Sequence, residues 1–268
     1  MTTKIHPTAI IDPTAELGEG VEIGPYAFIG AKVTLGDRVK VGHAATIEGV
    51  TVVGEETRIW PHAMVGADPQ DLKYNGEESC LEIGARGMIR EFASLHRGTV
   101  GGGLLTRIGD DVLIMNGGHV GHDAQVGNNC IIAAQSALGG HVVMGDHAII
   151  GGITGIHQWV HIGAHAMVAG GIFVHHDVPT YAVVNEEMER MAGVNVVGLR
   201  RRGFSRASIQ KIMAAMKLMF LERDEQPLAE ALEEAQTLYG DDPGVQALLT
   251  FTRSLGASDK KRGFASPR

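Results

Sequence analysis

The chain has 268 residues, 44% of them apolar, which is enough to bury the core of one large domain or two smaller ones. It lacks the roughly 18 consecutive apolar residues of a membrane helix and the apolar centre of a secretory signal, so we expect a cytoplasmic protein without integral membrane contact. The net charge is −8, and residues 1–178 hold 10 Lys and Arg against 19 Asp and Glu, which argues against a nucleic-acid partner.

Aliphatic residues recur every six positions along the first two thirds of the chain. One run has eleven members from Ile5 to Val65, the pattern resumes at Ile83, and a second run has twelve members from Ile108 to Val174. A period of six suits neither a helix nor a hairpin sheet, but it suits one short strand and one turn. The 37 glycines and the aromatic content of 5% favour tight turns around a narrow core. The period therefore predicts a parallel β-helix whose coils stack about 4.8 Å apart.

The repeat is interrupted twice, and a solenoid expels such insertions as surface loops, often on its binding face. We expect a β-helix over residues 1–180, with projecting loops at 67–82 and 99–107. The first insertion keeps the six-residue phase, since Val65 and Ile83 lie eighteen residues apart, whereas the second does not.

After Pro179 the six-residue period stops, and from Ser205 the apolar spacing becomes helical. Ser205 is a suitable N-cap, and two further helices are expected around Pro227–Tyr239 and Pro243–Arg253. Residues 190–268 are thus predicted to form a small α-helical C-terminal domain, with a disordered tail after Leu255.

Four histidines of the second run, His119, His122, His141 and His157, are candidates for chemistry. If three repeats make one coil, these residues lie one above another along an edge of the β-helix. A neutral imidazole suits a general base near pH 7, and three histidines with a water suit catalytic zinc. The alternative is that they are solvent-exposed turn residues. Asp123 follows His122 directly, but adjacent residues of a strand point apart, so a hydrogen bond between them requires turn geometry.

Two further groups of polar residues point to binding. The first group is Gln70, Asp71 and Lys73, in the first insertion. The second group lies between Glu189 and Glu222, a segment that contains no acidic residue. The basic residues of that second segment form a local positive patch that favours a phosphate or an acidic protein partner over a merely solvated helix face. They are Arg200, Arg201, Arg202, Arg206, Lys211 and Lys217. The two cysteines have no CxxC spacing and give no disulfide framework, so structural zinc is not expected.

At this point the chain resembles the UDP-N-acetylglucosamine acyltransferases that begin lipid A synthesis in Gram-negative bacteria. The motifs that carry the resemblance span nearly the whole chain in order. They are HPTA (His6–Ala9), QDLKY (Gln70–Tyr74), IRE and LHRGT (Ile89–Glu91, Leu95–Thr99), GGGL, HVGHD (His119–Asp123), GGH (Gly139–His141), HQ (His157–Gln158), IGAHAMV, DVPTY, GVN (Gly193–Asn195) and RRGFSR (Arg201–Arg206).

The resemblance implies a left-handed β-helix in a homotrimer, with active sites between neighbouring subunits. The implied reaction moves a 3-hydroxyacyl group from acyl carrier protein to the 3-hydroxyl of UDP-N-acetylglucosamine, without cofactor or metal. By resemblance, His122 is the general base, Asp123 orients it, and the Gly140 N–H donates to the oxyanion of the tetrahedral intermediate.

The resemblance also implies substrate contacts over much of the chain. The expected contacts to the substrates are Gln70, Asp71, Lys73, His96, His119, His141, His157 and Gln158, with Asn195, Arg201 and Arg202 on the nucleotide or its phosphates. Arg200, Arg206 and Lys211 would dock the acidic carrier protein, and Gly170 would set acyl length, favouring a long chain. The chain departs from the family at Val197, where a carboxylate is common, and over residues 184–188.

Three other functions stay open from the sequence. One is a zinc hydro-lyase resembling the γ-class carbonic anhydrases, which would use three of the histidines. Another is a non-catalytic binding trimer on the same scaffold. The third is a sibling N-acyltransferase acting on an acylated UDP-glucosamine, which usually carries an extra N-terminal domain. The acyl length and the choice between a 3-hydroxyl and a 3-amino acceptor also stay open.

Overall fold

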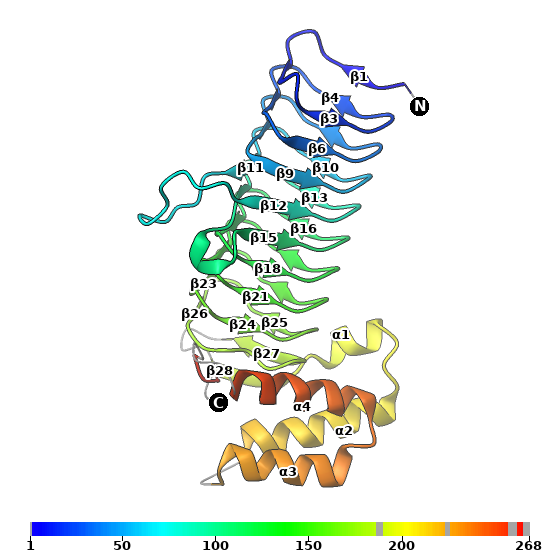
Figure 1. Cartoon of the computed structure of the whole chain (residues 1–268). Helices are drawn as coiled ribbons and strands as arrows, with labels where there is room; N and C mark the ends of the chain where they lie inside the picture. The colour runs from blue at the N-terminus through cyan, green and yellow to red at the C-terminus, as the bar shows by residue number, and fades with distance from the viewer. Residues whose placement is uncertain (1, 186–189, 223–225, 257–261, 265–268) are drawn as a thin grey trace.

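The computed structural model describes residues 2–185, 190–222, 226–256 and 262–264. The chain forms a left-handed parallel β-helix followed by helices that gather at its C-terminal end (Figure 1). This confirms the parallel β-helix predicted from the six-residue period, the left-handedness implied by the resemblance, and the helical region predicted after Ser205. No described helix has the length and apolar character needed to cross a membrane.

Three sheets form the sides of the β-helix. Sheet A contains β1 (Lys4–Ile5), β4 (Glu22–Ile23), β7 (Lys40–Val41), β10 (Arg58–Ile59), β13 (Met88–Ile89), β16 (Leu113–Ile114), β19 (Ile131–Ile132), β22 (Ile149–Ile150), β25 (Met167–Val168), β27 (Ala182–Asn185) and β28 (Arg190–Val194). Sheet B contains β2 (Ile10–Ile11), β5 (Phe28–Ile29), β8 (Thr46–Ile47), β11 (Met64–Ala67), β14 (Ser94–His96), β17 (His119–Val120), β20 (Ala137–Leu138), β23 (Gly155–Ile156) and β26 (Phe173–Val174). Sheet C contains β3 (Glu16–Leu17), β6 (Val33–Leu35), β9 (Val50–Val53), β12 (Cys80–Ile83), β15 (Leu105–Ile108), β18 (Gln125–Val126), β21 (Val143–Met144) and β24 (His161–Ile162).

The core follows directly from the repeat. Each regular coil has eighteen residues, so Ile23 pairs with Val41 and Ile132 with Ile150 in parallel register. The second residue of each two-residue strand points inward, and Ile29 and Ile132 are fully buried. Since adjacent strand residues face opposite sides, the preceding residue of each pair points outward. The aliphatic residues of the repeat, together with corner residues such as Ala27 and Val39, thus build one continuous core along the β-helix.

The corners of the β-helix are tight turns that place non-glycine residues in the left-handed region. Asp123 has φ +63°, His141 has φ +62° and Trp159 has φ +69°. The corner that joins sheet B to sheet C, here called the BC corner, carries all three of these residues in successive coils. Turn residues at such a corner project their side chains away from the core, which makes the corner a place to gather polar groups.

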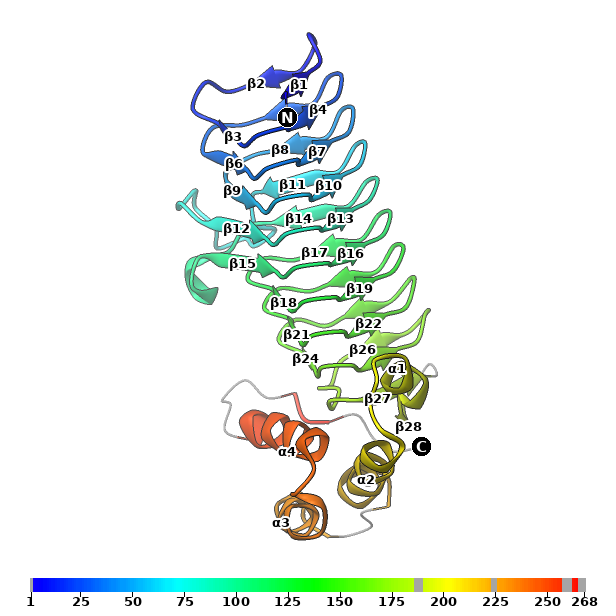
Figure 2. The ribbon, with the colours of Figure 1, turned by 90° about the vertical axis from the view of Figure 1, so that its right-hand side faces the viewer.

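Both inserted loops interrupt this same BC corner, in the two coils before His122. The first runs over residues 68–79, between β11 and β12, and projects from the β-helix (Figure 2). The second runs over residues 97–104 and contains the short 3₁₀ helix η1 (Val100–Gly102). The predicted bounds, 67–82 and 99–107, were too wide at their C-terminal ends, because Cys80–Ile83 and Leu105–Ile108 pair with each other in sheet C.

The β-helix also ends later than predicted. Strand β27 pairs parallel with β25, and β28 turns back antiparallel on β27, so sheet A extends beyond residue 180. The region from residue 190 therefore begins as a strand, and its helices are α1 (Val196–Arg201), α2 (Arg206–Met216), the π-helical η2 (Lys217–Leu221), α3 (Leu228–Tyr239) and α4 (Pro243–Gly256). The predicted N-cap is confirmed, since the Ser205 side chain accepts a hydrogen bond from the Ser208 N–H.

Part of the C-terminal tail is ordered against the β-helix, which corrects the prediction of disorder after Leu255. The Asp177 N–H donates to the Gly263 carbonyl at 2.7 Å, and the Arg262 N–H donates to the Asp177 carboxylate at 3.2 Å. The Phe264 ring packs edge-on against Phe220 of η2, with the ring centroids 5.0 Å apart. A buried carboxylate and an aromatic contact hold this segment, and neither partner is local in sequence. The rest of the tail, 257–261 and 265–268, lies outside the described residues.

Candidate active site

His122 and Asp123 are the two turn residues between β17 and β18 at the BC corner. The left-handed conformation of Asp123 turns its side chain back toward its neighbour, and the His122 Nδ1 lies 2.7 Å from the Asp123 Oδ2. This is the turn geometry that a hydrogen bond between adjacent residues requires. With the Nδ1 proton donated to the carboxylate, the His122 Nε2 is unprotonated and can accept a proton.

The Asp123 carboxylate is buried, with its side chain 1% exposed. Its Oδ1 accepts the Thr99 N–H at 2.7 Å and its Oδ2 accepts the Thr99 hydroxyl at 2.6 Å. The Asp123 N–H donates to the Thr106 Oγ at 2.7 Å. Donors on both oxygens hold the carboxylate in one orientation, which is what a partner of a protonating imidazole needs.

Gly140 occupies the same corner one coil after His122. A methyl group on its α-carbon would fall 2.6 Å from the His122 Cε1 and Nε2 atoms, so only glycine lets the imidazole lie there. None of the described residues accepts a hydrogen bond from the Gly140 N–H. A backbone donor beside the basic nitrogen is thus available to a bound substrate.

His141 and Trp159 form the other wall of this corner. Their rings stack with centroids 3.6 Å apart and planes 7° apart, and the His141 ring meets the His122 ring edge-on at 5.0 Å. The His141 Nδ1 is 3.6 Å from the Asp123 Oδ2, too far for a hydrogen bond. The dyad therefore pairs Asp123 with His122 and leaves His141 beside it.

His96 and His119 continue the histidine cluster along sheet B. The His96 Nδ1 donates to the Asp68 carbonyl at 2.7 Å, while its buried Nε2 has no hydrogen-bond partner among the described residues. The His119 Nδ1 is 2.9 Å from the Ser94 Oγ. Burial lowers the pKa of His119 to about 4, and burial also lowers the pKa of His96. Both rings are therefore neutral near pH 7.

A cavity of about 300 Å³ joins the first inserted loop to this corner. Asp71 and Lys73 of the loop line it together with His141 and Trp159. The Asp71 Oδ1 accepts the Lys73 N–H at 3.0 Å, which fixes the turn between them, whereas Gln70 is exposed on the same loop. Two groups predicted from the sequence, the polar residues of the first loop and the histidines of the second run, thus meet at one cavity.

A second hollow of about 230 Å³ lies on the outer surface of sheet B. It is lined by His119, Gly139, His157 and Phe173 and is almost wholly apolar. Gln158 is the exposed turn residue that follows His157, one coil beyond Gly140. The apolar hollow thus runs alongside the BC corner.

Other predicted site residues lie on different edges of the β-helix. The Asn195 side chain accepts the Gly198 N–H and donates to the His165 carbonyl, both at 3.0 Å, and Arg202 donates to the His147 carbonyl at 3.3 Å. His147 and His165 lie at the corner between sheets C and A. Arg200, Arg201 and Arg206 are exposed, Lys211 pairs with Asp241 at 2.6 Å, and Gly170 lies at the corner between sheets A and B. Within one chain, these residues are not brought to His122.

Comparison with known proteins agrees with both halves of the chain. The family model described as bacterial transferase hexapeptide (six repeats) matches residues 2–37 and 105–140, and the model described as UDP N-acetylglucosamine O-acyltransferase, domain 2, matches residues 177–265. The acyl-[acyl-carrier-protein]--UDP-N-acetylglucosamine O-acyltransferase of Myxococcus xanthus is 45% identical over 92% of this chain and 95% of its own length. The chain belongs to the UDP-N-acetylglucosamine O-acyltransferase family.

Solved structures of the family agree with this assignment. The LpxA structure from Acinetobacter baumannii superposes with a TM-score of 0.92 at 38% identity, covering 97% of this chain and 99% of that one. The UDP-N-acetylglucosamine acyltransferase from Francisella novicida gives 0.91 at 31% identity, over 98% and 94%. The resemblance stated from the motifs is confirmed.

The family membership and the geometry both bear on the zinc alternative. His122, Asp123 and His141 are the described residues that place possible ligand atoms within 4.8 Å of one another. This set has two histidines rather than three, and both oxygens of its carboxylate already accept hydrogen bonds. The donor set thus fits a general-base dyad better than the three-histidine zinc site of the sequence-based alternative.

Several residues at the site were not identified from the sequence. Thr99 holds Asp123, Trp159 stacks on His141, and Arg97 binds Asp68 and Tyr74 of the first loop. Trp159 follows the HQ motif directly, and one-coil spacing from His141 would have found it. Thr99 and Arg97 belong to the LHRGT motif, but their contacts cross the insertions, where the eighteen-residue register no longer applies.

Proposed function

We propose that this protein transfers a 3-hydroxyacyl chain from acyl carrier protein to the 3-hydroxyl of UDP-N-acetylglucosamine, the first step of lipid A biosynthesis. The observation that carries the proposal is the His122–Asp123 dyad with the Gly140 N–H beside it. The family assignment supports the same reaction. We place it in the cytoplasm, where acyl carrier protein and UDP-sugars occur.

The proposed chemistry needs one base and one oxyanion donor. The His122 Nε2 takes the proton of the sugar 3-hydroxyl as the oxygen attacks the thioester carbonyl, and the buried Asp123 carboxylate stabilises the imidazolium. The Gly140 N–H donates to the oxyanion of the tetrahedral intermediate. The C–S bond then breaks, and the imidazolium returns its proton to the departing thiolate of the carrier protein.

The substrate contacts follow from the two hollows beside the dyad. Asp71, Lys73 and His141 line the polar cavity, which we assign to the sugar and its phosphates, with Gln70, His96 and Gln158 as further contacts. The apolar hollow with His119 and His157 is assigned to the acyl chain. Gly170 would limit the length of that chain from a neighbouring subunit. A methyl group there would lie 2.9 Å from the Gly152 carbonyl oxygen, so a larger residue must also shift the turn.

A homotrimer is proposed from the character of the three outer faces. From Met88 to Met167 the outward residues of sheet A are apolar, although its first four strands carry Lys4, Glu22, Lys40 and Arg58. Sheet B exposes Ile10, Met64 and Phe173, and the outward positions of sheet C include Val52 as well as charged residues. Examples of the latter are Glu16, Glu82 and Arg107. The apolar part of sheet A and the apolar residues of sheet B favour a head-to-tail ring in which sheet A of one copy covers sheet B of the next.

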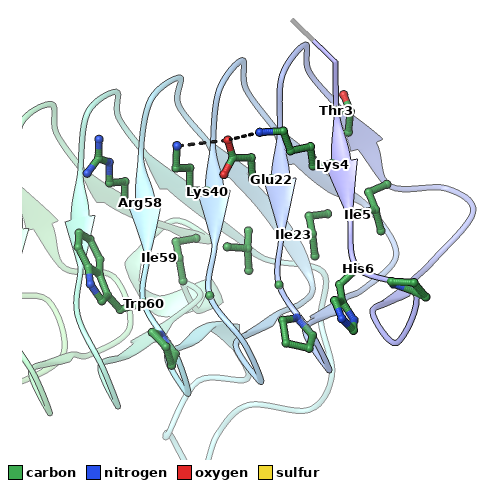
Figure 3. A pocket seen from close by; sticks show the side chains of 16 residues that line it. Thr3, Lys4, Ile5, His6, Glu22, Ile23, Lys40, Arg58, Ile59 and Trp60 are labelled. Atoms are coloured by element: carbon green, nitrogen blue, oxygen red, sulfur yellow. Dashed lines mark hydrogen bonds and ion pairs between the residues drawn. The ribbon is translucent and has the colours of Figure 1, made fainter.

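The same ring would account for a larger hollow of about 770 Å³ near the N-terminus of sheet A (Figure 3). Glu22 in this hollow pairs with Lys4 at 3.6 Å and Lys40 at 3.3 Å, and Trp60 lies at its far side. It contains none of the predicted catalytic residues, and we assign it to contact between subunits. Sedimentation equilibrium at three times the chain mass of 28.5 kDa would support the trimer, and a monomer mass would refute it.

The ring also explains why the proposed nucleotide contacts lie away from His122 in one chain. Arg201 and Arg202, beside the capping Asn195, would reach the site of a neighbouring subunit. The exposed Arg200 and Arg206 would dock the acidic carrier protein, while Lys211 contributes less because Asp241 neutralises it. Residues 186–189, which include part of the segment that departs from the family, lie outside the described residues.

The decisive experiment is a transfer assay with UDP-N-acetylglucosamine, its 3-amino analogue and a panel of 3-hydroxyacyl carrier proteins. His122→Ala should lower the rate roughly 100-fold or more without changing the melting temperature, as the loss of a general base does. His43→Ala, at an exposed position, is the matched control. Wild-type activity in the His122 variant, or no transfer by the unmodified protein, would refute the proposal.

A further inference from the structure

Among the described residues, Thr99 makes both hydrogen bonds that the Asp123 carboxylate receives from outside its own dyad. Its N–H donates to the Oδ1 at 2.7 Å and its hydroxyl donates to the Oδ2 at 2.6 Å. The Oδ2 is also the atom that accepts from the His122 Nδ1. One residue of the second inserted loop thus sets the position of the oxygen on which the dyad depends.

The loop is folded tightly around this contact. Thr99 is itself 5% exposed, and its carbonyl accepts the Leu104 N–H at 2.7 Å and the Gly102 N–H at 3.1 Å. A methyl group on Gly102 would overlap the Asp123 carboxylate, so the loop backbone lies directly against it. Thr99 precedes η1, yet its hydroxyl does not cap this turn and binds Asp123 instead. The loop is built to enclose a carboxylate rather than merely to close a gap in the repeat.

A second imidazole competes for the same oxygen. The His141 Nδ1 lies 3.6 Å from the Asp123 Oδ2, against 2.7 Å for His122. A small rotation of the carboxylate would bring it within reach of His141. The two donors of Thr99 oppose that rotation, because they hold both carboxylate oxygens at once.

We propose that Thr99 is a positioning residue that directs the Asp123 carboxylate to His122 and away from His141, which makes the second inserted loop part of the catalytic machinery. Thr99 lies in the wall of the polar cavity, but its N–H and its hydroxyl are both donated to the Asp123 carboxylate, so it acts through Asp123. The proposal rests on the proposed role of His122 as general base.

The test compares Thr99→Val with Thr99→Ser in the full chain. Valine keeps the shape and the N–H donor but removes the hydroxyl, and we expect kcat to fall roughly tenfold while KM for UDP-N-acetylglucosamine stays within about twofold. Serine restores the hydroxyl and should restore kcat. Thr51→Val is the matched control, because Thr51 is fully buried and its hydroxyl donates to the Glu48 carbonyl at 2.7 Å, away from the site. Unchanged kcat in Thr99→Val, or no recovery with serine, would overturn the proposal.

A second measurement needs no turnover. The ¹⁵N shifts of the His122 ring, assigned by their absence in His122→Gln, report which nitrogen carries the proton. We expect the Nδ1–H tautomer to dominate in the unmodified protein and to lose population in Thr99→Val but not in Thr51→Val. If the unmodified protein transfers no acyl group, the proposed function fails, but the tautomer comparison still tests whether Thr99 orients the dyad. An unchanged tautomer population in Thr99→Val would refute that role.

Discussion

The imidazole of His122 lies against the α-carbon of Gly140, in the space where any other residue would carry its β-carbon. A methyl group there would fall 2.6 Å from the His122 Nε2. Gly140→Ala should therefore displace the base, and we expect kcat to fall roughly 10- to 100-fold, since a displacement of about 1 Å can cost that much. Steady-state transfer kinetics and a thermal melt would separate this effect from unfolding.

The matched control for this variant is Gly87→Ala. Gly87 occupies the core position between sheets C and A that Val39, Thr57 and Val112 fill in other coils, and a methyl group there would meet Thr57 at an ordinary 3.4 Å. It should leave kcat unchanged. Equal kcat in the Gly140 variant and this control would show that the base tolerates displacement.

Arg97 fixes the base of the loop that carries Asp71 and Lys73. Its guanidinium pairs with Asp68 and donates to the Tyr74 hydroxyl at 3.1 Å, and its side chain is largely buried. Arg97→Ala should release the loop and raise KM for UDP-N-acetylglucosamine roughly tenfold, because substrate binding must then order the loop. The measurement is KM at saturating acyl carrier protein.

Lys32→Ala provides the comparison for Arg97. Lys32 pairs with Glu78 at the other end of the same loop, but both side chains are mostly exposed. An exposed pair contributes little because solvent screens it, so KM should change less than twofold. A KM equally insensitive to both changes would mean that the loop is held by its backbone alone.

The β-helix could be predicted in detail because its cause is local and periodic. Ile29, Ile47 and Val65 each belong to the series of aliphatic residues that recurs every six positions. Each is fully buried at the same place in its coil. Three repeats of six residues make one coil of eighteen residues. The period therefore determines which residues of neighbouring coils pair, for example Ile29 with Ile47. The helices after Ser205 were predictable for the same reason, because their apolar spacing is also local and periodic.

The site was only partly predictable, since its geometry depends on what breaks the period. A spacing of one coil plus one residue brought His122 near His141. The turn conformation of Asp123 decided that the two adjacent residues of the dyad meet. The contact between Thr99 and Asp123 spans twenty-four residues that include a non-repeating loop, so no register predicts it. The order in Arg262–Phe264 depends in the same way on a distant partner, Asp177.

His165 makes stability depend on pH. Its ring stacks on His147 and meets Tyr181 and Phe204, and its buried Nδ1 has no hydrogen-bond partner among the described residues. Burial, with help from His147 and Arg202 and against a weaker opposing effect of Asp146, lowers the pKa of His165 from 6.5 to about 4. The unfolded chain therefore binds a proton between pH 6.5 and 4 that the folded chain does not bind.

It follows that the free energy of unfolding falls as the pH drops from about 6.5 to about 4, because the unfolded state gains the proton. His165→Phe keeps an aromatic ring in the cluster but cannot titrate, so its free energy of unfolding should fall less over this range. Urea denaturation at pH 7.5 and pH 4.5, at one protein concentration, measures the difference. The control is His43→Gln at an exposed position, whose free energy of unfolding should fall as much between pH 7.5 and pH 4.5 as that of the unmodified protein. An equal fall in the His165→Phe variant would show that another group is responsible. His119, whose pKa burial also lowers to about 4, should then account for part of the slope that remains.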